Sequence, residues 1–172
     1  MRLRVAVVLL ILAVTLPCVA ATPDMPRFKW ENFTTANGLP NDHVFCVLVD
    51  GSRIWAGTED GLALYENGKW KVYSTKDGLA HRAVLSLALD PETGDVWAGT
   101  MGGVSRFSAG RFDTFNQLNS GVSNDVVYSV SVGGDYVWMA TAAGASRLNK
   151  RTGQWSLFNE RNTPMYEIWT YN

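Results

Sequence analysis

Short apolar runs alternate along this chain with clusters of glycine, asparagine, aspartate and serine, and no helical periodicity appears after residue 21. The runs are rich in valine, isoleucine, leucine and aromatic residues, which favour strands, and the clusters between them favour turns. We therefore predict three groups of four strands. They are Val44–Asp50, Arg53–Thr58, Leu62–Glu66 and Lys69–Tyr73; Val84–Asp90, Asp95–Thr100, Val104–Ser108 and Arg111–Phe115; and Val127–Val132, Tyr136–Thr141, Ala145–Asn149 and Gln154–Phe158.

The first strand of a group is apolar at nearly every position, as in Phe45–Val49 and Val84–Leu89. A continuous apolar run indicates a strand that is covered on both faces. Sheets that radiate from an axis meet this condition, because each sheet lies between two neighbours. The hairpin sequences Glu66–Lys69 and Arg151–Gln154 place glycine where a tight turn needs a positive φ.

A phrase with tryptophan, threonine and glycine at fixed spacing recurs once in each group. The three tryptophans lie 42 and 41 residues apart, as do the three threonines and the three glycines. The members are Trp55, Thr58 and Gly61; Trp97, Thr100 and Gly103; and Trp138, Thr141 and Gly144. One tryptophan in each period of about 40–45 residues is typical of a β-propeller. The sequence thus predicts an all-β chain, a partial β-propeller with complete four-stranded antiparallel blades at 44–73, 84–115 and 127–158.

Both ends of this pattern are incomplete. A lone strand is predicted at 28–34, before the first blade, and another at 165–171, after the third. Closed propellers typically have about four to eight blades, so the propeller repeats at 22–172 are interpreted as the N-terminal piece of a longer propeller. The alternative is a short chain that closes by self-association. The expected partner is therefore the remainder of its own propeller or another copy.

Residues 1–21 are predicted to be a signal peptide. Arg2 and Arg4 precede the apolar stretch Val5–Leu16, and Val19–Ala21 offers small residues for cleavage. Twelve residues in a helix span only about 18 Å, short of the roughly 30 Å hydrocarbon core of a membrane. We expect an exported protein, periplasmic or secreted, whose mature segment makes no membrane contact. Cys18 suggests a lipoprotein, but Thr15 and Pro17 do not fit the motif that lipidation needs.

Composition narrows the choice of partners. Removal of residues 1–21 takes away two arginines, which leaves 13 basic against 16 acidic residues and a net charge of −3. This balance argues against nucleic-acid binding, which needs a basic face. The mature segment keeps one cysteine, Cys46, which is expected to be a small buried hydrophobe. The structure must then be stabilised by packing, and the aromatic side chains supply the area.

Most of the repeated residues have a structural interpretation. The tryptophans could stack on a sugar or base, but their strict period favours packing between blades. The threonines are expected to form local hydrogen bonds at the strand ends. The sequence contains none of the catalytic or metal-binding motifs expected for nucleophiles, zinc or calcium, so no catalytic residue, metal or cofactor is predicted.

The loops that lead into the first strand of each blade carry polar residues that vary between repeats. By the strand count these loops, 35–43, 75–83 and 116–126, converge on one face, at the mouth of the central channel. Variable polar groups around a concave mouth suit a ligand pocket for a small molecule or oligosaccharide. The candidate residues are Asp42, His43, His81, Arg82, Asn124 and Asp125. The competing explanation is that surface loops tolerate variation.

These repeats resemble a known family. The first combines Asn37-Gly38-Leu39-Pro40 with Ile54–Thr58 and Asp60-Gly61-Leu62; the second, Asp77-Gly78-Leu79 with Val96–Thr100 and Gly103-Val104; the third, Ser120-Gly121-Val122 with Val137–Thr141 and Gly144-Ala145. They are similar to the two-component regulator propeller repeat, over roughly 28–171. The fourth segment, Asn159–Pro164, lacks the Gly-Leu element.

The resemblance implies a non-catalytic periplasmic sensor, the N-terminal part of a two-component-type signalling regulator, with any kinase or other output module downstream. In that family the repeats build seven-bladed propellers in the periplasmic part of bacterial sensors. Two alternatives stay open. One is a propeller enzyme similar to streptogramin lyases, which act through a histidine and a metal, and the other is a secreted protein-interaction scaffold.

Overall fold

The computed structural model describes residues 29–164. Phe28, the predicted signal peptide 1–21 and the predicted strand 165–171 lie outside the described residues. Residues 29–31 belong to a unit separate from the one that begins at Asn32.

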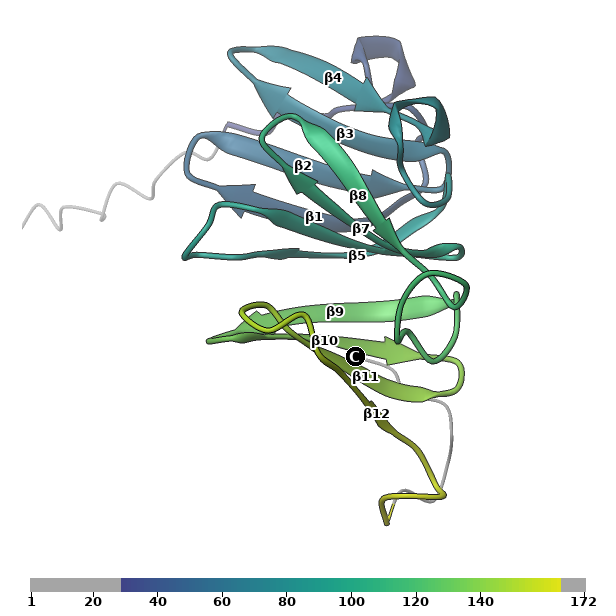
Figure 1. Cartoon of the computed structure of the whole chain (residues 1–172). Coiled ribbons are helices and arrows are strands. Elements are labelled where there is room, and N and C mark those ends of the chain that lie inside the picture. The colour runs from purple at the N-terminus through teal and green to yellow at the C-terminus, as the bar shows by residue number, and fades with distance from the viewer. Residues whose placement is uncertain (1–28, 165–172) are drawn as a thin grey trace, which may run out of the picture. The chain divides into compact units, whose positions relative to one another are not determined.

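Residues 44–158 form three four-stranded antiparallel sheets, each a simple up-and-down meander (Figure 1). Blade 1 contains β1 (Val44–Asp50), β2 (Arg53–Thr58), β3 (Gly61–Glu66) and β4 (Lys69–Tyr73); blade 2, β5 (Val84–Leu89), β6 (Val96–Thr100), β7 (Gly103–Ser108) and β8 (Arg111–Phe115); blade 3, β9 (Val127–Gly133), β10 (Tyr136–Thr141), β11 (Gly144–Asn149) and β12 (Trp155–Phe158). The observed strand bounds differ from the predicted ones by one residue at most. The predicted fold class, a partial propeller with three complete blades, is confirmed.

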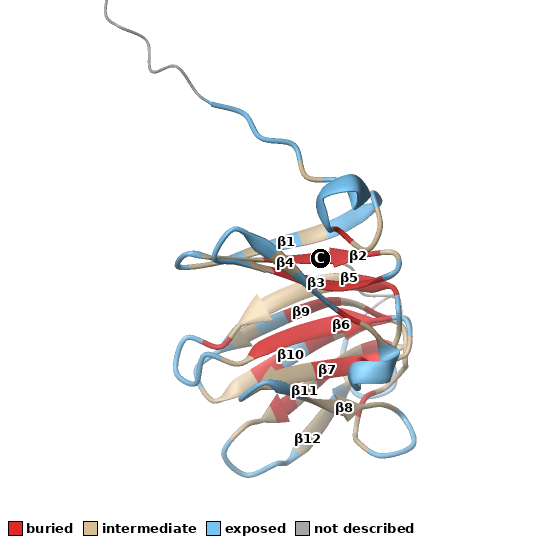
Figure 2. Ribbon diagram, turned by 90° about the horizontal axis from the view of Figure 1, so that it is seen from above, coloured by how far each residue is buried: buried red, intermediate tan, exposed pale blue. Residues whose placement is uncertain are grey.

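The first strands of the blades, β1, β5 and β9, lie side by side, so the blades pack face against face. We call the side of a blade that points to the next blade in the sequence its forward face, and the opposite side its rear face. Trp55 on the forward face of blade 1 is fully buried with Leu62 and Leu64 against Val84 and Val96 of blade 2. Buried residues concentrate in the middle strands, between the blades (Figure 2).

The same packing joins blades 2 and 3. Trp97 on the forward face of blade 2 is buried against Val130, Val137 and Met139 of blade 3. Each of these tryptophans also stacks on the aromatic residue of its own outer strand, with a centroid distance of 5.7 Å between Trp97 and Phe115. Trp55 and Trp97 therefore pack between blades, as the period predicts.

Trp138 corrects the expectation that all three repeated tryptophans are buried. It stacks on Phe158 at 5.3 Å and lies under the guanidinium of Arg147, yet it remains 39% exposed. The physical reason is its place on the forward face of blade 3, where no blade among residues 32–164 follows. On the rear face of blade 1 the inner strand β1 is also open, with Val47 61% and Val49 66% exposed, whereas Ala56 and Ala63 of the same face are buried with Leu39.

The repeated threonine and glycine close the turn between the second and third strands of each blade. In blade 2 the Thr100 hydroxyl donates to the Gly103 carbonyl at 2.7 Å and accepts from the Gly102 N–H at 3.0 Å. Gly103 has a φ of +112°, and a Cβ there would lie 2.2 Å from the Phe115 carbonyl oxygen. Only glycine fits this position, because both the backbone angle and the space exclude a side chain.

The loops that lead into blades 1 and 2 contain short helical turns that the strand pattern does not predict. Two are single-turn 3₁₀ helices, η1 (Thr35–Asn37) and η2 (Thr75–Asp77). Ser74 and Asp77 cap η2, and hydrogen bonds from the Ser74 N–H and hydroxyl lower the pKa of Asp77. The expectation of a mature chain without helix is thus corrected at these two turns.

The predicted strand at 28–34 is not a strand over residues 29–34. Strand pairing there is replaced by other contacts. Thr34 caps η1, and the Phe33 ring packs on Tyr65 at 5.1 Å and on Trp70 at 5.4 Å. Trp70 lies on the outer strand β4 and Tyr65 is its register partner on β3, so side-chain packing rather than a backbone ladder holds Phe33 on blade 1.

Candidate functional site

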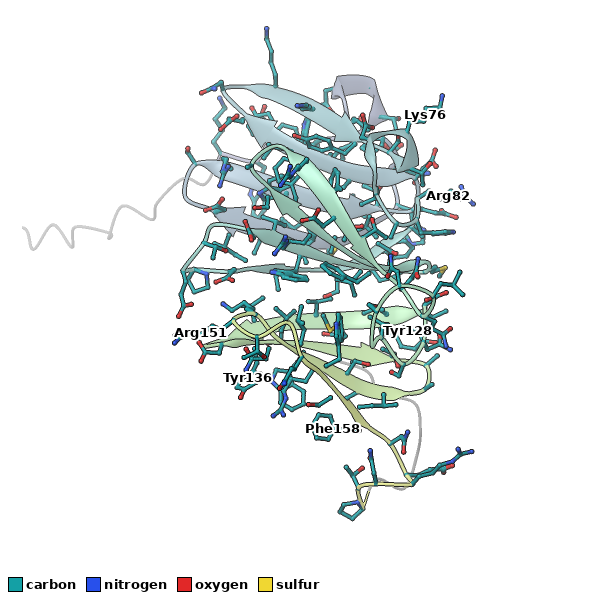
Figure 3. All side chains as sticks on the ribbon, in the orientation of Figure 1. Lys76, Arg82, Tyr128, Tyr136, Arg151 and Phe158 are labelled. Atoms are coloured by element: carbon teal, nitrogen blue, oxygen red, sulfur yellow. The ribbon has the colours of Figure 1, made fainter. Side chains whose placement is uncertain are left out.

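The loops that enter β1, β5 and β9 lie at the same end of the sheets as the β2–β3, β6–β7 and β10–β11 turns. Backbone hydrogen bonds join them across blades: the Gly61 N–H donates to the Arg82 carbonyl at 2.7 Å, and the Gly103 N–H donates to the Asp125 carbonyl at 2.7 Å. We call this end the loop face. Figure 3 shows Arg82 at the loop face and Tyr136 and Arg151 at the opposite end.

Four of the six candidate residues hold their own loops together. His81 Nδ1 accepts the Ala83 N–H at 3.1 Å, and Asn124 Oδ1 accepts the Val126 N–H at 2.8 Å. Asp42 accepts from the Thr35 N–H at 2.6 Å, and Asp125 accepts from the Gln117 N–H at 2.8 Å. These bonds recur at equivalent positions of different blades, which is the pattern of a repeated turn.

His43 and Arg82 differ, because their side chains reach solvent and face carboxylates of the adjacent turn. His43 Nδ1 lies 3.4 Å from Glu59 Oε2, and Arg82 Nη1 lies 3.6 Å from Asp60 Oδ1. All four side chains are roughly half exposed, so each contact contributes little stability and is free to exchange partners. These two pairs are exposed polar groups at the loop face that a polar ligand can reach.

Asp42 and His43, although adjacent in the sequence, do not contact each other as a pair, since Asp42 bonds within its loop and His43 faces Glu59. No cluster of three or more histidine, cysteine or carboxylate side chains is placed to hold a metal ion in the part of the chain between residues 29 and 164. In the same range no helix is long and apolar enough to cross a membrane.

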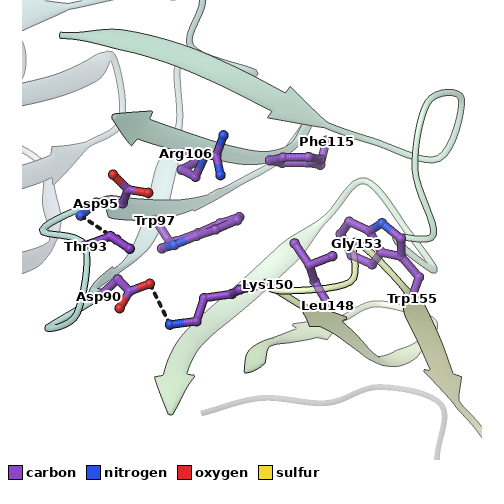
Figure 4. Close-up of a pocket in the computed structure, with 10 residues that line it drawn as sticks. All are labelled: Asp90, Thr93, Asp95, Trp97, Arg106, Phe115, Leu148, Lys150, Gly153 and Trp155. Carbon is purple, nitrogen blue, oxygen red and sulfur yellow. Dashed lines mark hydrogen bonds and ion pairs between the residues drawn. The ribbon is translucent and has the colours of Figure 1, made fainter. Parts of the chain in front are cut away.

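A cavity of about 330 Å³ lies between blades 2 and 3, away from the loop face, and sequence reasoning did not anticipate it (Figure 4). Blade 2 and its β5–β6 hairpin supply most of the wall, and blade 3 supplies the rest. The lining residues are Asp90, Thr93, Asp95, Trp97, Arg106, Phe115, Leu148, Lys150, Gly153 and Trp155. Because three of these are aromatic and four are charged, the cavity combines apolar walls with polar groups, as ligand pockets do.

An ion pair between blades borders this cavity. Lys150 Nζ donates to Asp90 Oδ2 at 2.7 Å, and the Asp90 side chain is 1% exposed. Burial by itself raises the pKa of Asp90, but hydrogen bonds from Lys150 and from the Glu92 N–H outweigh it, and the pKa is lowered. Burial likewise acts to lower the pKa of Lys150, and the hydrogen bond to Asp90 raises it overall.

Comparisons with known proteins concern the fold. No protein-family model matches the chain, and no curated protein matches it. Among solved structures, the extracellular domain of the hybrid two-component system BT3049 from B. thetaiotaomicron is similar, with a TM-score of 0.75 and 18% identity over 83% of this chain and 22% of that one.

Two further structures share the architecture. The extracellular domain of the one-component system BT4673 from B. thetaiotaomicron aligns with a TM-score of 0.57 and 19% identity, over 70% of this chain and 17% of that one. PorZ, a surface component of the type-IX secretion system of Porphyromonas gingivalis, aligns with a TM-score of 0.62 and 13% identity, over 72% of this chain and 20% of that one. This chain thus spans about a fifth of the length of each. At these identities the likeness establishes the propeller fold, and the two regulators agree with the resemblance that the repeats carry.

Proposed function

We propose that this chain is part of an exported, non-catalytic sensor propeller of a two-component-type regulator, and that it binds a small molecule or oligosaccharide at the loop face. The observation that carries the proposal is the fold, which it shares with the extracellular domains of BT3049 and BT4673. The exposed pairs His43–Glu59 and Arg82–Asp60 support the choice of face. The proposal assigns no chemical step to the described residues.

Ligand binding is tested by thermal shift of the purified protein against a panel of small molecules and neutral oligosaccharides. We expect a compound that raises Tm in the parent and not in the His43→Ala/Arg82→Ala double variant. Arg111→Ala, an exposed arginine on the outer strand β8, is the matched control and keeps the shift. A compound that the double variant still binds contradicts the loop-face site, and turnover of the compound favours the enzyme alternative.

Export is tested separately. Alkaline phosphatase folds and is active only in an oxidising compartment, so we expect activity when it is fused after residue 30. Arg2→Glu/Arg4→Glu removes the positive n-region and is expected to abolish that activity. Phosphatase activity that persists in the double variant would show that these residues do not direct export.

Further propeller structure is the partner we propose for the open faces of blades 1 and 3, either from the same polypeptide or from another copy. Trp138 supports this, because its equivalents Trp55 and Trp97 are at most 1% exposed where a blade covers them. Light scattering after size-exclusion chromatography tests the second source. Oligomers that Trp138→Arg dissociates indicate another copy, and a monomer contradicts that source.

A further inference from the structure

The loops that lead into blades 1, 2 and 3 share one hydrogen bond, in which a side chain accepts the backbone N–H of the residue two positions later. The acceptors and donors are Asn41 Oδ1 and the His43 N–H at 2.7 Å, His81 Nδ1 and the Ala83 N–H at 3.1 Å, and Asn124 Oδ1 and the Val126 N–H at 2.8 Å. Blade 2 therefore uses an imidazole nitrogen where blades 1 and 3 use an amide oxygen.

The two kinds of acceptor respond differently to protons. The amide oxygen of asparagine accepts hydrogen bonds over the whole physiological pH range. An imidazole nitrogen accepts only while it carries no proton, so His81 holds its own proton on Nε2 when Nδ1 binds the Ala83 N–H. Histidine is the side chain whose charge ordinarily changes between pH 5 and pH 8. Once it is charged, both ring nitrogens are donors, and the Ala83 N–H loses its acceptor.

The two residues that follow the histidine join this loop to its neighbours. The Ala83 carbonyl accepts the Met101 N–H of the β6–β7 turn at 3.4 Å, and the Arg82 carbonyl accepts the Gly61 N–H of blade 1 at 2.7 Å. The Arg82 side chain lies 3.6 Å from Asp60, also in blade 1. A change at the Ala83 N–H therefore acts directly on the backbone of Arg82, which is one of the residues of the proposed ligand site.

The charged groups around His81 have other partners. Arg82 follows it on the same loop and faces Asp60 of the β2–β3 turn. Glu59 of that turn faces His43 instead. None of the ion pairs among residues 29–164 includes His81. Within this range no carboxylate is paired with the ring, so a proton that the ring gains acts on its hydrogen bond.

The elements that pack against this loop add no further titratable partner. The β6–β7 turn lies against the histidine, since a Cβ at Gly102 would be 2.9 Å from His81 Cβ, and neither residue of this turn has a titratable side chain. On β7 the Ser105 hydroxyl accepts a backbone N–H of the loop at 2.9 Å. Asp125 of the following loop directs its carboxylate to the Gln117 N–H at 2.8 Å.

We propose that protonation of His81 releases the loop that enters blade 2 and shifts Arg82, so that the loop face changes with pH while the loops of blades 1 and 3 keep their bonds. The inference names a regulation of the loop-face site, and it rests on the proposed function for its consequence. The proton itself is the probe, so this switch is found or refuted whether or not a small molecule binds.

Two-dimensional NMR of the purified protein between pH 8 and pH 5 tests the switch. The ring protons of His81 report its charge, and amide hydrogen exchange, corrected for the intrinsic effect of pH on exchange, reports each N–H. We expect the protection of the Ala83 N–H to fall about two- to tenfold as His81 titrates, which is the scale of one hydrogen bond. The Gly61 N–H should lose protection with it. The Val126 N–H, bound to Asn124, is the internal control and should keep its protection.

Two variants separate the histidines, of which the chain has two. His81→Asn gives blade 2 the acceptor that blades 1 and 3 already have, so its Ala83 N–H should stay protected down to pH 5. His43→Gln is the matched control and should leave the response of Ala83 intact. If His81→Asn does not fold, the parent decides alone, because Ala83 and Val126 are compared within one molecule.

Four results overturn the proposal. Ala83 and Gly61 keep their protection while His81 titrates, His81→Asn responds as the parent does, or His43→Gln abolishes the response. The fourth is an equal loss of protection at Val126, because the whole fold rather than one loop would then be opening.

Discussion

The Asp90–Lys150 pair offers a direct measure of how firmly blade 3 is packed on blade 2. Lys150→Met keeps most of the side-chain volume and removes the charge that compensates a carboxylate 1% exposed. Loss of one partner of a buried pair typically destabilises by about 3–5 kcal/mol. Asp90 still accepts the Glu92 N–H at 3.0 Å, so we expect a loss of about 2–4 kcal/mol.

Urea unfolding at pH 7, followed by tryptophan fluorescence, measures this loss. Asp90→Asn/Lys150→Met removes both charges and keeps the hydrogen bond to Glu92, so it should cost only about 1 kcal/mol. The matched control is Arg151→Met, which breaks the exposed pair between Arg151 Nε and Asp135 Oδ1 at 2.6 Å and should cost less than about 1 kcal/mol. If Lys150→Met costs no more than Arg151→Met, the ion pair does not stabilise the interface and the reasoning is refuted.

The same pair predicts a pH dependence at each end of the scale. The pKa of Asp90 is lowered in the folded state, so its contribution is present above about pH 4 and is lost as the pH falls through the folded pKa. The pKa of Lys150 is raised, so its contribution is present below about pH 10.4 and is lost as the pH rises through the folded pKa. The difference in stability between the parent and the double variant should therefore shrink at both extremes, and a constant difference contradicts this account.

Two further predictions concern single residues. Gly103→Ala should destabilise the protein by at least about 2 kcal/mol, because the new Cβ meets the Phe115 carbonyl at a positive φ. Gly133 has open space around it, so Gly133→Ala should change the stability in urea by less than about 1 kcal/mol. Equal effects of the two variants would contradict the assigned turn. Burial raises the pKa of the Cys46 thiol to about 12, so the folded protein should resist alkylation at pH 8 and react once unfolded; rapid alkylation of the folded protein would place this thiol at the surface.

The strands and the blade architecture could be predicted from the sequence because their signals are local. Apolar runs, turn glycines and the spacing of Trp55, Trp97 and Trp138 all act within one blade or between equivalent positions of blades. The turns in the loops before the blades also have a sequence pattern, but a search for strands and glycines does not detect it. In three of these turns the backbone N–H of one residue donates to the side-chain oxygen of the residue three positions later, at 2.8–2.9 Å. The donor and acceptor residues are Ser74 and Asp77, Asn116 and Asn119, and Asn159 and Asn162.

Asn159 therefore begins the same turn as the earlier loops, although its segment lacks the Gly-Leu element. The turn depends on a short side-chain acceptor three residues on, and a strand-and-glycine pattern does not contain that feature. This explains why the fourth segment departs from the repeat in sequence while it keeps the repeat's local geometry.

The cavity and its ion pair depend on contacts between blades, which lie far apart in the sequence. Asp90 and Lys150 are separated by 60 positions. Likewise, the exposure of Trp138 is decided by what covers blade 3, so the period alone could not reveal it.

The central claim is that the repeated tryptophan stabilises the fold where a following blade covers it. It is tested most directly by comparing Trp97→Ala with Trp138→Ala in urea unfolding. Trp97 is 1% exposed and Trp138 is 39% exposed at equivalent positions. We predict losses of about 3–5 kcal/mol for Trp97→Ala and about 1–2 kcal/mol for Trp138→Ala. Equal losses, or a larger loss at Trp138, would contradict the account.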